Sequence, residues 1–184
     1  MSQQQFDLAE GFRKHQEEIL ARWVEYTLST YESSDFFKKE KNQFANPIGG
    51  NVRIALGELL PLLIKGAGRS AYEPPLERII SIRAVQQFTP AQAVSPLNAI
   101  KHITREILAA DPESKHLNGE LYDFDFAVDI ALLAAFDIYM QFRERIYSVR
   151  IREIKSGSIV LTDSKCPSKL LKPEGEIPMV QAGI

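Results

Sequence analysis

The sequence predicts an all-α protein: a bundle of about five main helices with a long C-terminal helix, followed by an irregular tail. Apolar residues recur at three- and four-residue steps through residues 1–155 of the 184-residue chain. Capping residues and prolines separate these periodic segments. The character then changes, because residues 156–184 contain several glycines and prolines and no aromatic residue. We therefore expect a helical domain over 1–155 and a Pro/Gly-containing tail over 156–184.

The first helix is expected over 8–30, because Asp7 and Glu10 have the spacing of a capping box. A connection of one or two short helical turns follows, and its aromatic side chains are expected to point inward: Phe36, Phe37 and Phe44.

The second main helix is expected over 46–66. Asn46 is a suitable N-cap, Pro47 suits the first helical position and Gly66 is a suitable C-terminal stop. Pro61 lies inside this helix and predicts a bend, because proline lacks the backbone donor.

A loop over 66–75 precedes a shorter helix over 76–88. The next helix is expected over 89–110, since Thr89, Pro90 and Gln92 combine a cap, a proline start and a capping-box partner. Pro96 predicts a kink early in it.

The last helix is expected over 120–155, which contains neither glycine nor proline. It would be about 54 Å long, whereas a compact domain of this size is about 40 Å across, so it either breaks or extends from the body. Residues 126–140 are apolar on every face except at Asp129 and Asp137, which predicts burial in the middle of the bundle.

The second half of this helix, 143–155, is basic. We interpret this as complementing the helix dipole, with a docking surface for an acidic partner as the alternative. Tyr147, Ile151 and Ile154 follow coiled-coil-like spacing and predict a contact with a second subunit or another protein.

Composition excludes several classes of protein. With 24 acidic and 22 basic residues and a net charge of −2, a charge-driven nucleic-acid binder is not expected. A single cysteine, Cys166, excludes an intramolecular disulfide. The polar start lacks the pattern of a signal peptide, and the long helix is too charged to span a membrane, so we expect a cytoplasmic protein without membrane insertion.

No residue pattern points to catalysis, to a cofactor or to a metal site, and we predict none of these. The three histidines, His15, His102 and His116, lack metal-ligand spacing. His102 alone could be an axial haem ligand, although a surface or core position is favoured. The acidic residues Asp123, Asp125 and Asp129 fit the start of a helix better than an acid/base or metal site. Ser-His-Asp catalysis stays open, without a nucleophile-elbow pattern.

The strongest candidate site is a group of polar residues within apolar helices. Asp137 sits between Phe136 and Ile138, where an isolated charge would be costly. Its candidate partners are Arg83 and Arg78, and we predict that it pairs with Arg83 while Gln86 adds a hydrogen bond. A buried ion pair that fixes helix register is the favoured interpretation. A small-molecule pocket formed by the same residues is the alternative. Cys166, flanked by lysines, allows a redox function.

Four blocks of the sequence resemble one protein family: 22–26 (RWVEY), 44–49 (FANPIG), 82–94 (IRAVQQFTPAQAV) and 135–147 (AFDIYMQFRERIY). That family is the N-terminal domain of the RsbT co-antagonist proteins of the bacterial stressosome, of the RsbR/RsbRD type. The resemblance covers roughly 8–155, and the pair Ser95-Pro96 departs from the unbroken apolar helix expected there.

The resemblance implies a globin-like helical domain that carries no haem, forms a homodimer and serves as the sensory or interaction part of a signalling protein. In the family the last helix leads into a STAS domain that a partner kinase phosphorylates, and the chain after Lys155 is too short for it. We therefore expect a free-standing regulatory module whose output is contact with an unidentified signalling protein.

Overall fold

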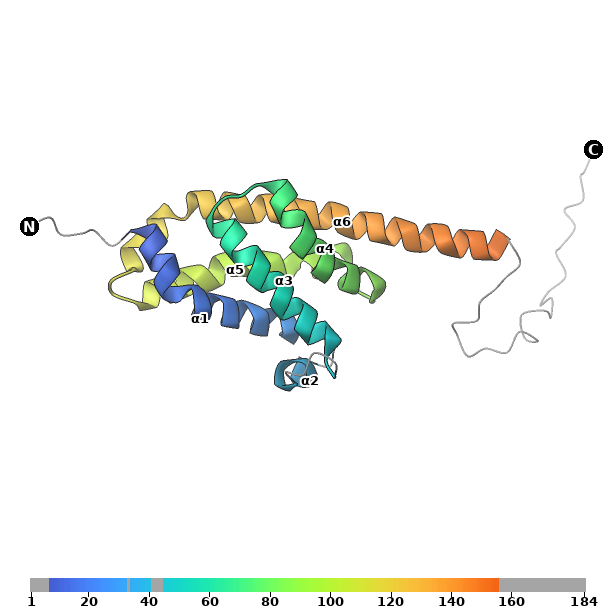
Figure 1. Ribbon diagram of the computed structural model, residues 1–184, viewed down its shortest axis with the longest axis horizontal. Coiled ribbons are helices and arrows are strands. Elements are labelled where there is room, and N and C mark those ends of the chain that lie inside the picture. Colours follow the sequence, from blue (N-terminus) through green and yellow to red (C-terminus); the bar gives the residue numbers. More distant parts are fainter. Residues whose placement is uncertain (1–6, 33, 41–44, 156–184) are drawn as a thin grey trace, which may run out of the picture. The chain divides into compact units, whose positions relative to one another are not determined.

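The computed structural model describes residues 7–32, 34–40 and 45–155. Its elements, in chain order, are α1 (Leu8–Ser29), α2 (Ser34–Lys39), α3 (Pro47–Ile64), α4 (Arg69–Val85), α5 (Pro90–Ala110), the short 3₁₀-helix η1 (Lys115–Glu120) and α6 (Tyr122–Lys155) (Figure 1). The described residues contain no strand. The all-α prediction is therefore confirmed, and so is the long last helix. The predicted tail over 156–184, with Cys166, lies outside the described residues.

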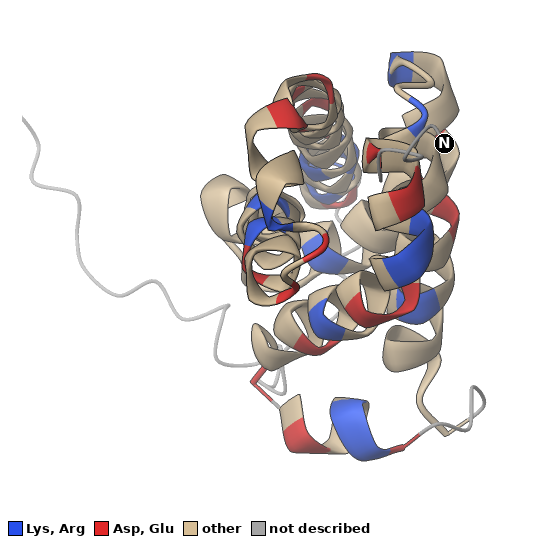
Figure 2. Cartoon of the chain, turned by 90° about the vertical axis from the view of Figure 1, so that its left-hand side faces the viewer, with Lys and Arg blue, Asp and Glu red and all other residues tan. Residues whose placement is uncertain are grey.

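The described residues up to Ile146 form one compact unit, and residues from Tyr147 onward belong to a second. Within the first unit, α1 packs against α3 and α5, and α3 packs against α4. Acidic and basic residues occur together on the same helices (Figure 2), as expected for a chain with nearly balanced charge. The predicted domain boundary after residue 155 stays a prediction.

The capping signals place the helix starts correctly. The amide of Glu10 donates to Asp7 Oδ1 at 2.8 Å, and the amide of Asp7 donates to Glu10 Oε2 at 3.3 Å. The Thr89–Gln92 pair forms the same reciprocal box at the start of α5. These predictions succeed because a cap depends on a few consecutive residues and on little of the tertiary structure.

Asn46 caps α3 and also holds α2 in place. Its Oδ1 accepts from the amide of Gly49 at 2.7 Å, while its Nδ2 donates to the carbonyls of Phe37 at 2.9 Å and Glu40 at 2.8 Å. A Cβ at Gly49 would lie 2.3 Å from that Nδ2, so the close approach requires glycine. At the other end of α3, Gly66 has φ 61° and the amide of Ala67 donates to the carbonyl of Leu62, a Schellman stop.

Two helix predictions need correction. The α4 helix begins at Arg69, not at residue 76, so Pro74 and Pro75 lie inside it. Tyr72 and Pro75 are buried there, and their packing compensates for the backbone donors that the prolines lack. The rings of the 31–45 connection do not all point inward either, since Phe36 is half-exposed while Phe37 packs against Tyr31. Phe44 lies outside the described residues.

The α6 helix is unbroken from Tyr122 to Lys155. The prediction that 126–140 is buried on every face is wrong, because Leu133 is 58% exposed and Phe126, Phe136 and Met140 are exposed as well. The core contact of this stretch is made instead by mainly small and medium side chains and one tyrosine: Ala127, Val128, Ala131, Ala134, Ala135, Ile138 and Tyr139. Within the described residues, only α3 is long and apolar enough to cross a membrane, and its packing against α1 and α4 is that of a core helix.

Replacing Asn46 tests the junction of α2 and α3. We expect Asn46→Ala to lower the free energy of unfolding by about 2 kcal/mol, because the cap of α3 and two carbonyl partners are lost together. Asn46→Asp, which keeps the cap but not the amide donors, should lose about half as much. Urea unfolding followed by circular dichroism measures both, and a loss below about 0.5 kcal/mol for the alanine variant would contradict this account of Asn46.

Candidate functional site

A buried arginine lies where α1 ends, α4 ends and α5 begins. Arg83, in the last turn of α4, is 1% exposed. Its Nε donates to the carbonyl of Ala93 at 2.9 Å, its Nη2 to the carbonyl of Gln92 at 2.9 Å, and its Nη1 to Thr30 Oγ1 at 3.0 Å. One guanidinium therefore joins three helical segments.

Pro96 explains why a carbonyl of α5 is available to Arg83. In a regular helix the amide of residue 96 would donate to the carbonyl of Gln92, but proline has no amide hydrogen. Arg83 supplies the missing donor. The carbonyl of Pro96 itself accepts from Trp23 Nε1 at 2.8 Å, which fixes the same turn against α1.

Aromatic rings complete the surroundings of Arg83. Its Cζ lies 4.1 Å from the ring centre of Phe88 and 4.8 Å from that of Tyr31, within the range of cation–π attraction. Among the residues that the structure describes, no carboxylate forms an ion pair with Arg83. The positive charge is therefore balanced only by carbonyl and hydroxyl dipoles and by ring faces.

The predicted Arg83–Asp137 pair is wrong. Asp137 is 50% exposed and accepts from Arg69 Nη2 at 2.6 Å, across to the start of α4. Its apolar neighbours in sequence did not indicate burial, because Phe136 next to it also faces outward. Gln86, expected to assist the pair, instead has a buried Oε1 without a hydrogen-bond partner.

A cavity of about 430 Å³ lies beside the buried arginine, between the end of α1, α2 and the α4–α5 connection. It is lined by Tyr31, Glu32, Phe37, Gln86, Gln87 and Phe88. The hydroxyl of Tyr31, like Gln86 Oε1, is inaccessible to solvent, and it lies close to the guanidinium of Arg83. Burial raises the pKa of Tyr31 above its ordinary value, although the charge of Arg83 acts in the opposite direction. Sequence reasoning found Gln86 here but missed the aromatic walls.

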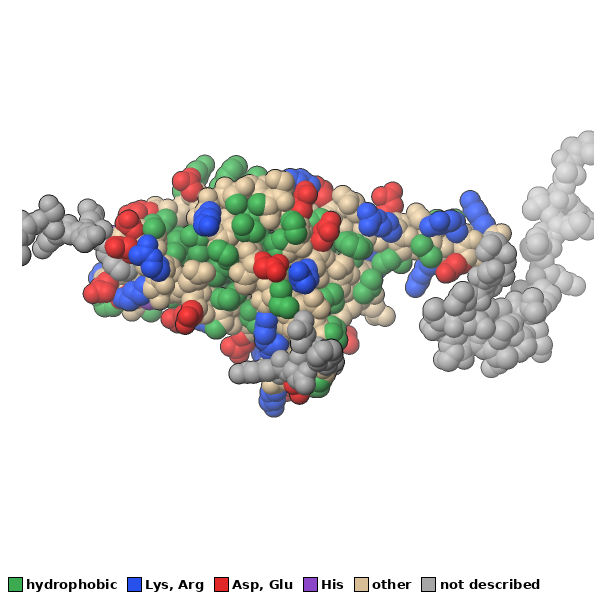
Figure 3. All heavy atoms as spheres, in the orientation of Figure 1, with side chains coloured by type: hydrophobic (Ala, Val, Ile, Leu, Met, Phe, Trp, Pro, Cys, Tyr) green, Lys and Arg blue, Asp and Glu red, His purple; other side chains and the backbone are tan. Residues whose placement is uncertain are grey.

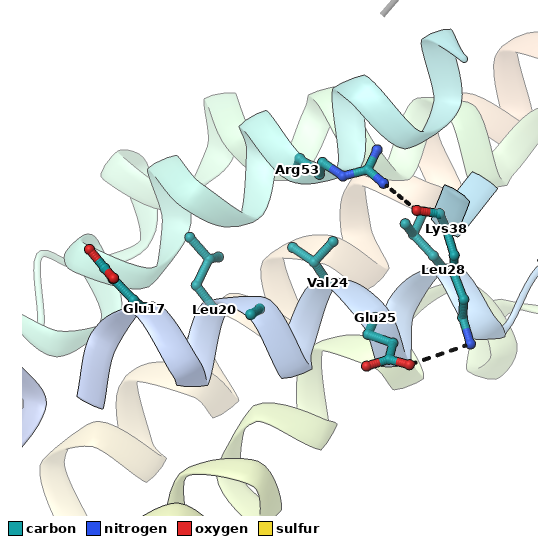
Figure 4. Close-up of a pocket in the computed structure, with 8 residues that line it drawn as sticks. Glu17, Leu20, Val24, Glu25, Leu28, Lys38 and Arg53 are labelled. Atoms are coloured by element: carbon teal, nitrogen blue, oxygen red, sulfur yellow. Dashed lines mark hydrogen bonds and ion pairs between the residues drawn. The ribbon is translucent and has the colours of Figure 1, made fainter. Parts of the chain in front are cut away.

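A second hollow, of about 570 Å³, lies along α1 between α2 and α3 (Figure 4). Leu20, Val24 and Leu28 form its apolar floor, with Glu17 and Glu25 at its edge. Arg53 bounds it from α3 and donates to the carbonyls of Phe37 and Lys38 at 3.1 and 3.2 Å. The Arg53 side chain at this hollow therefore attaches α2 to α3.

An apolar stripe runs along the exposed side of α6 between 122 and 140. Its members recur at steps of four and three residues, interrupted only at Asp129, whose carboxylate pairs with Lys101 of α5 at 2.6 Å. The stripe, which we call the α6 stripe, consists of Tyr122, Phe126, Leu133, Phe136 and Met140. Sequence reasoning assigned the members within 126–140 to the core, although their heptad-like spacing was visible in the sequence. Figure 3 shows hydrophobic side chains exposed among charged ones on one face of the protein.

The predicted contact residues Tyr147, Ile151 and Ile154 belong to the second unit, and each is at least half-exposed. This exposure is compatible with a contact surface, and their role as one stays a prediction.

One cluster brings serine, histidine and aspartate together. His15 Nε2 lies 2.9 Å from Asp111 Oδ2 and 3.1 Å from Ser114 Oγ, and Ser114 Oγ donates to Asp111 at 2.7 Å. In a catalytic triad the acid and the serine contact opposite ring nitrogens, whereas here both contact the same one. Ser114 is also fully buried. We interpret these hydrogen bonds as structural, because they attach α1 to the segment that follows α5.

The other residues considered for haem, metal or acid/base chemistry do not form a common site. His102 is exposed and pairs with Glu106 at 3.0 Å. Asp125 pairs with Arg105 and Asp129 with Lys101. Over the ranges that the structure describes, no group of three or more His, Cys, Asp or Glu side chains is placed to hold a metal ion.

Comparison with known proteins gives one match. A family model described as the RsbT co-antagonist protein rsbRD N-terminal domain matches residues 17–154, which is more than half of the chain. No curated protein and no solved structure matches the chain. The resemblance found from the sequence blocks is therefore confirmed.

Arg83 can be tested against an exposed arginine. Arg83→Met should lower the free energy of unfolding by about 3 kcal/mol, because three buried hydrogen bonds from a charged donor, to Gln92, Ala93 and Thr30, are lost together. The matched control Arg69→Met removes an exposed ion pair and should lower the free energy of unfolding much less. Urea unfolding measures both, and equal losses would contradict the role given to Arg83.

The lowered pKa of Asp111 predicts that the stability of the protein depends on pH. Its hydrogen bonds, from Lys14 first and then from Ser114, hold the pKa of this carboxyl well below its usual range. The native state therefore binds this proton less readily than the unfolded state. The stabilisation is complete above the ordinary pKa of about 4 and is lost as the pH falls through the lowered pKa.

We therefore expect acid unfolding of the wild type to be steeper below about pH 4 than that of Asp111→Asn. Thermal unfolding over a pH series checks this, and parallel curves would refute the linkage.

Proposed function

The chain belongs to the family of the RsbT co-antagonist protein rsbRD N-terminal domain, a family of signalling domains, and from this premise we propose that it is a non-catalytic regulatory module that acts through protein contact as a homodimer. We further propose a globin-like arrangement of its helices without haem, a cytoplasmic location and a place in a stressosome-type signalling system. Its output is contact with another signalling protein.

The α6 stripe is the observation that carries this proposal. Exposure of large apolar side chains to water costs free energy. A contiguous exposed apolar patch on a soluble domain is therefore typical of a contact site. Steps of four and three residues match the pattern by which one helix packs along another. A second copy of the same helix offers the same spacing, so a two-fold contact is self-complementary.

The polar groups around the α6 stripe favour contact with a second copy of the chain. Asp129 is already paired with Lys101 of α5, and Asp137, beside the stripe, is paired with Arg69 of α4. Both acids are thus neutralised within their own chain, so two copies can approach without bringing unpaired carboxylates together. Tyr147, Ile151 and Ile154 supply a second apolar stretch, which we propose as a further dimer or partner contact.

The geometry of the polar clusters supports a non-catalytic role. The cluster of His15, Asp111 and Ser114 lacks the arrangement of a proton relay. The buried arginine is engaged by backbone carbonyls of its own chain.

Leu133→Asp tests the dimer. A carboxylate in the middle of the α6 stripe should convert the dimer to a monomer, as measured by light scattering after size-exclusion chromatography, because burying the charge at the interface is costly. The free energy of unfolding of the monomer should change by about 0.5 kcal/mol or less, since the side chain is exposed.

The control for this experiment is Val85→Asp, which places the same charge at an exposed apolar residue outside the stripe, 66% exposed against 58% for Leu133. It should remain dimeric. Ile151→Asp assigns the second stretch, since loss of the dimer in this variant alone would place the contact after residue 146. A monomeric wild type, or a Leu133→Asp protein with unchanged mass, would contradict the proposed α6 contact.

A further inference from the structure

A cavity of about 590 Å³ lies where the start of α1, the end of α3, the start of α4 and the start of α6 meet. We call it the four-helix cavity. It shares no lining residue with the cavity beside Arg83. Each of the four helices contributes to the buried part of its lining, which consists of Phe12, Leu63, Tyr72, Phe124 and Ala127. Its volume is within the size range of small-molecule sites.

One polar group in the buried part of this lining has no partner. Tyr72 is 1% exposed, and its hydroxyl forms no hydrogen bond with the described residues. Unlike the hydroxyl of Tyr31, the Tyr72 hydroxyl is not closed off from solvent. Because Tyr72 lines the four-helix cavity, this accessible hydroxyl faces the interior of the cavity. A hydroxyl on an almost fully buried side chain normally has a partner, so this one is available to a bound molecule.

The other buried walls of the four-helix cavity are apolar and fixed by packing. The rings of Phe12 and Phe124 lie against each other, with 5.0 Å between their centres. Leu63 and Ala127 are buried beside them. Because these side chains are already held in place, little conformational entropy would be lost when a ligand binds. Such walls favour a ligand whose body is apolar.

The exposed part of the lining favours a ligand without charge. It contains one cation and one anion, Lys65 and Asp123, whose opposite signs leave no net charge in the lining. Gly66 and Gly68 leave an opening here, since a Cβ on either residue would meet no neighbouring atom within 4 Å. A molecule can enter at this opening. A full charge that moved on into the apolar part would lose its hydration without gaining an ionic partner there.

From these contacts we propose that the four-helix cavity binds a small uncharged molecule with an apolar body and one hydroxyl or carbonyl oxygen, which forms a hydrogen bond with the Tyr72 hydroxyl. This site goes beyond the proposed function, because it adds the binding of a small molecule to a protein contact. Phe126 belongs both to the α6 stripe and to the exposed part of the lining, whereas no residue of the buried part belongs to the stripe. One chain therefore forms the site by itself.

Titration of the full chain, followed by nuclear magnetic resonance chemical shifts, tests the site with benzyl alcohol as the probe. Toluene is the analogue without the hydroxyl, and benzoate is the charged analogue. Benzyl alcohol should shift the amide signals of Gly66 and Gly68, and benzoate should bind at least about tenfold more weakly. Benzoate binding as tight as that of benzyl alcohol, or no shift with benzyl alcohol, would overturn the proposal.

Tyr72→Phe separates ligand binding from folding. It should be at least as stable as the wild type, because the lost hydroxyl has no partner in the protein. Its dissociation constant for benzyl alcohol should rise about tenfold, whereas that for toluene should stay within about twofold. If both dissociation constants change equally, or if neither changes, the assigned hydrogen bond is refuted.

Two controls complete the experiment. Tyr139→Phe removes a hydroxyl that donates to the carbonyl of Phe88 outside the four-helix cavity, so it should lower the stability and leave the affinity for benzyl alcohol unchanged. Leu133→Asp removes the proposed α6 contact, and Leu133 does not line the cavity, so this variant should bind benzyl alcohol like the wild type. Loss of binding in Leu133→Asp would contradict a site formed by one chain. Light scattering on the same samples reports the dimer separately, so failure of the ligand site and failure of the α6 contact are distinguishable.

Discussion

The structure depends on the hydrogen bonds that the buried guanidinium of Arg83 donates. Burial of a charged group is costly unless acceptors surround it, and Arg83 donates to two carbonyls of α5 and to the hydroxyl of Thr30, the C-cap of α1. One of those carbonyls is available because Pro96 has no amide hydrogen. The residue that weakens α5 as an isolated helix thus gives the domain an attachment point. The end of α1, the end of α4 and the start of α5 are held together there, and the neighbouring cavity takes its shape from this junction.

The parts of the fold that depend on consecutive residues were predictable from the sequence. The caps at Asp7, Asn46 and Thr89 and the stop at Gly66 lie where the residues indicated. The start of α4 was missed because two prolines suggested a loop, whereas the burial of Tyr72 extends the helix. Local rules describe what a segment prefers, and packing decides between preferences that are close in free energy.

The candidate site was only half predictable, for a related reason. Arg83 was recognised as a buried cation in an apolar helix, but its partners are backbone carbonyls, which every sequence contains and no residue type marks. Asp137 was assigned to it because apolar neighbours suggested burial. An exposed apolar stripe and a buried one look alike in sequence, so the outward face of α6 was taken for core. The same misassignment concealed the surface on which the proposed dimer rests.

The helix that carries the proposed dimer contact also contacts the surroundings of Arg83. Tyr139 of α6 donates its hydroxyl to the carbonyl of Phe88 at 2.6 Å, and Arg143 donates to the carbonyl of Ala84 at 3.2 Å. Phe88 is a wall of the cavity and a ring against Arg83, so α6 holds the backbone that positions both.

Nuclear magnetic resonance of the arginine Nε–H groups tests whether Arg83 joins the three helices, with the Arg83 signal assigned by its loss in Arg83→Met. A guanidinium buried and hydrogen-bonded to the carbonyl of Ala93 should exchange its Nε hydrogen at least about tenfold more slowly than the exposed arginines. It should also show a scalar coupling across that hydrogen bond. Exchange as fast as that of Arg69, with no coupling, would contradict the account of Arg83 as the junction of α1, α4 and α5.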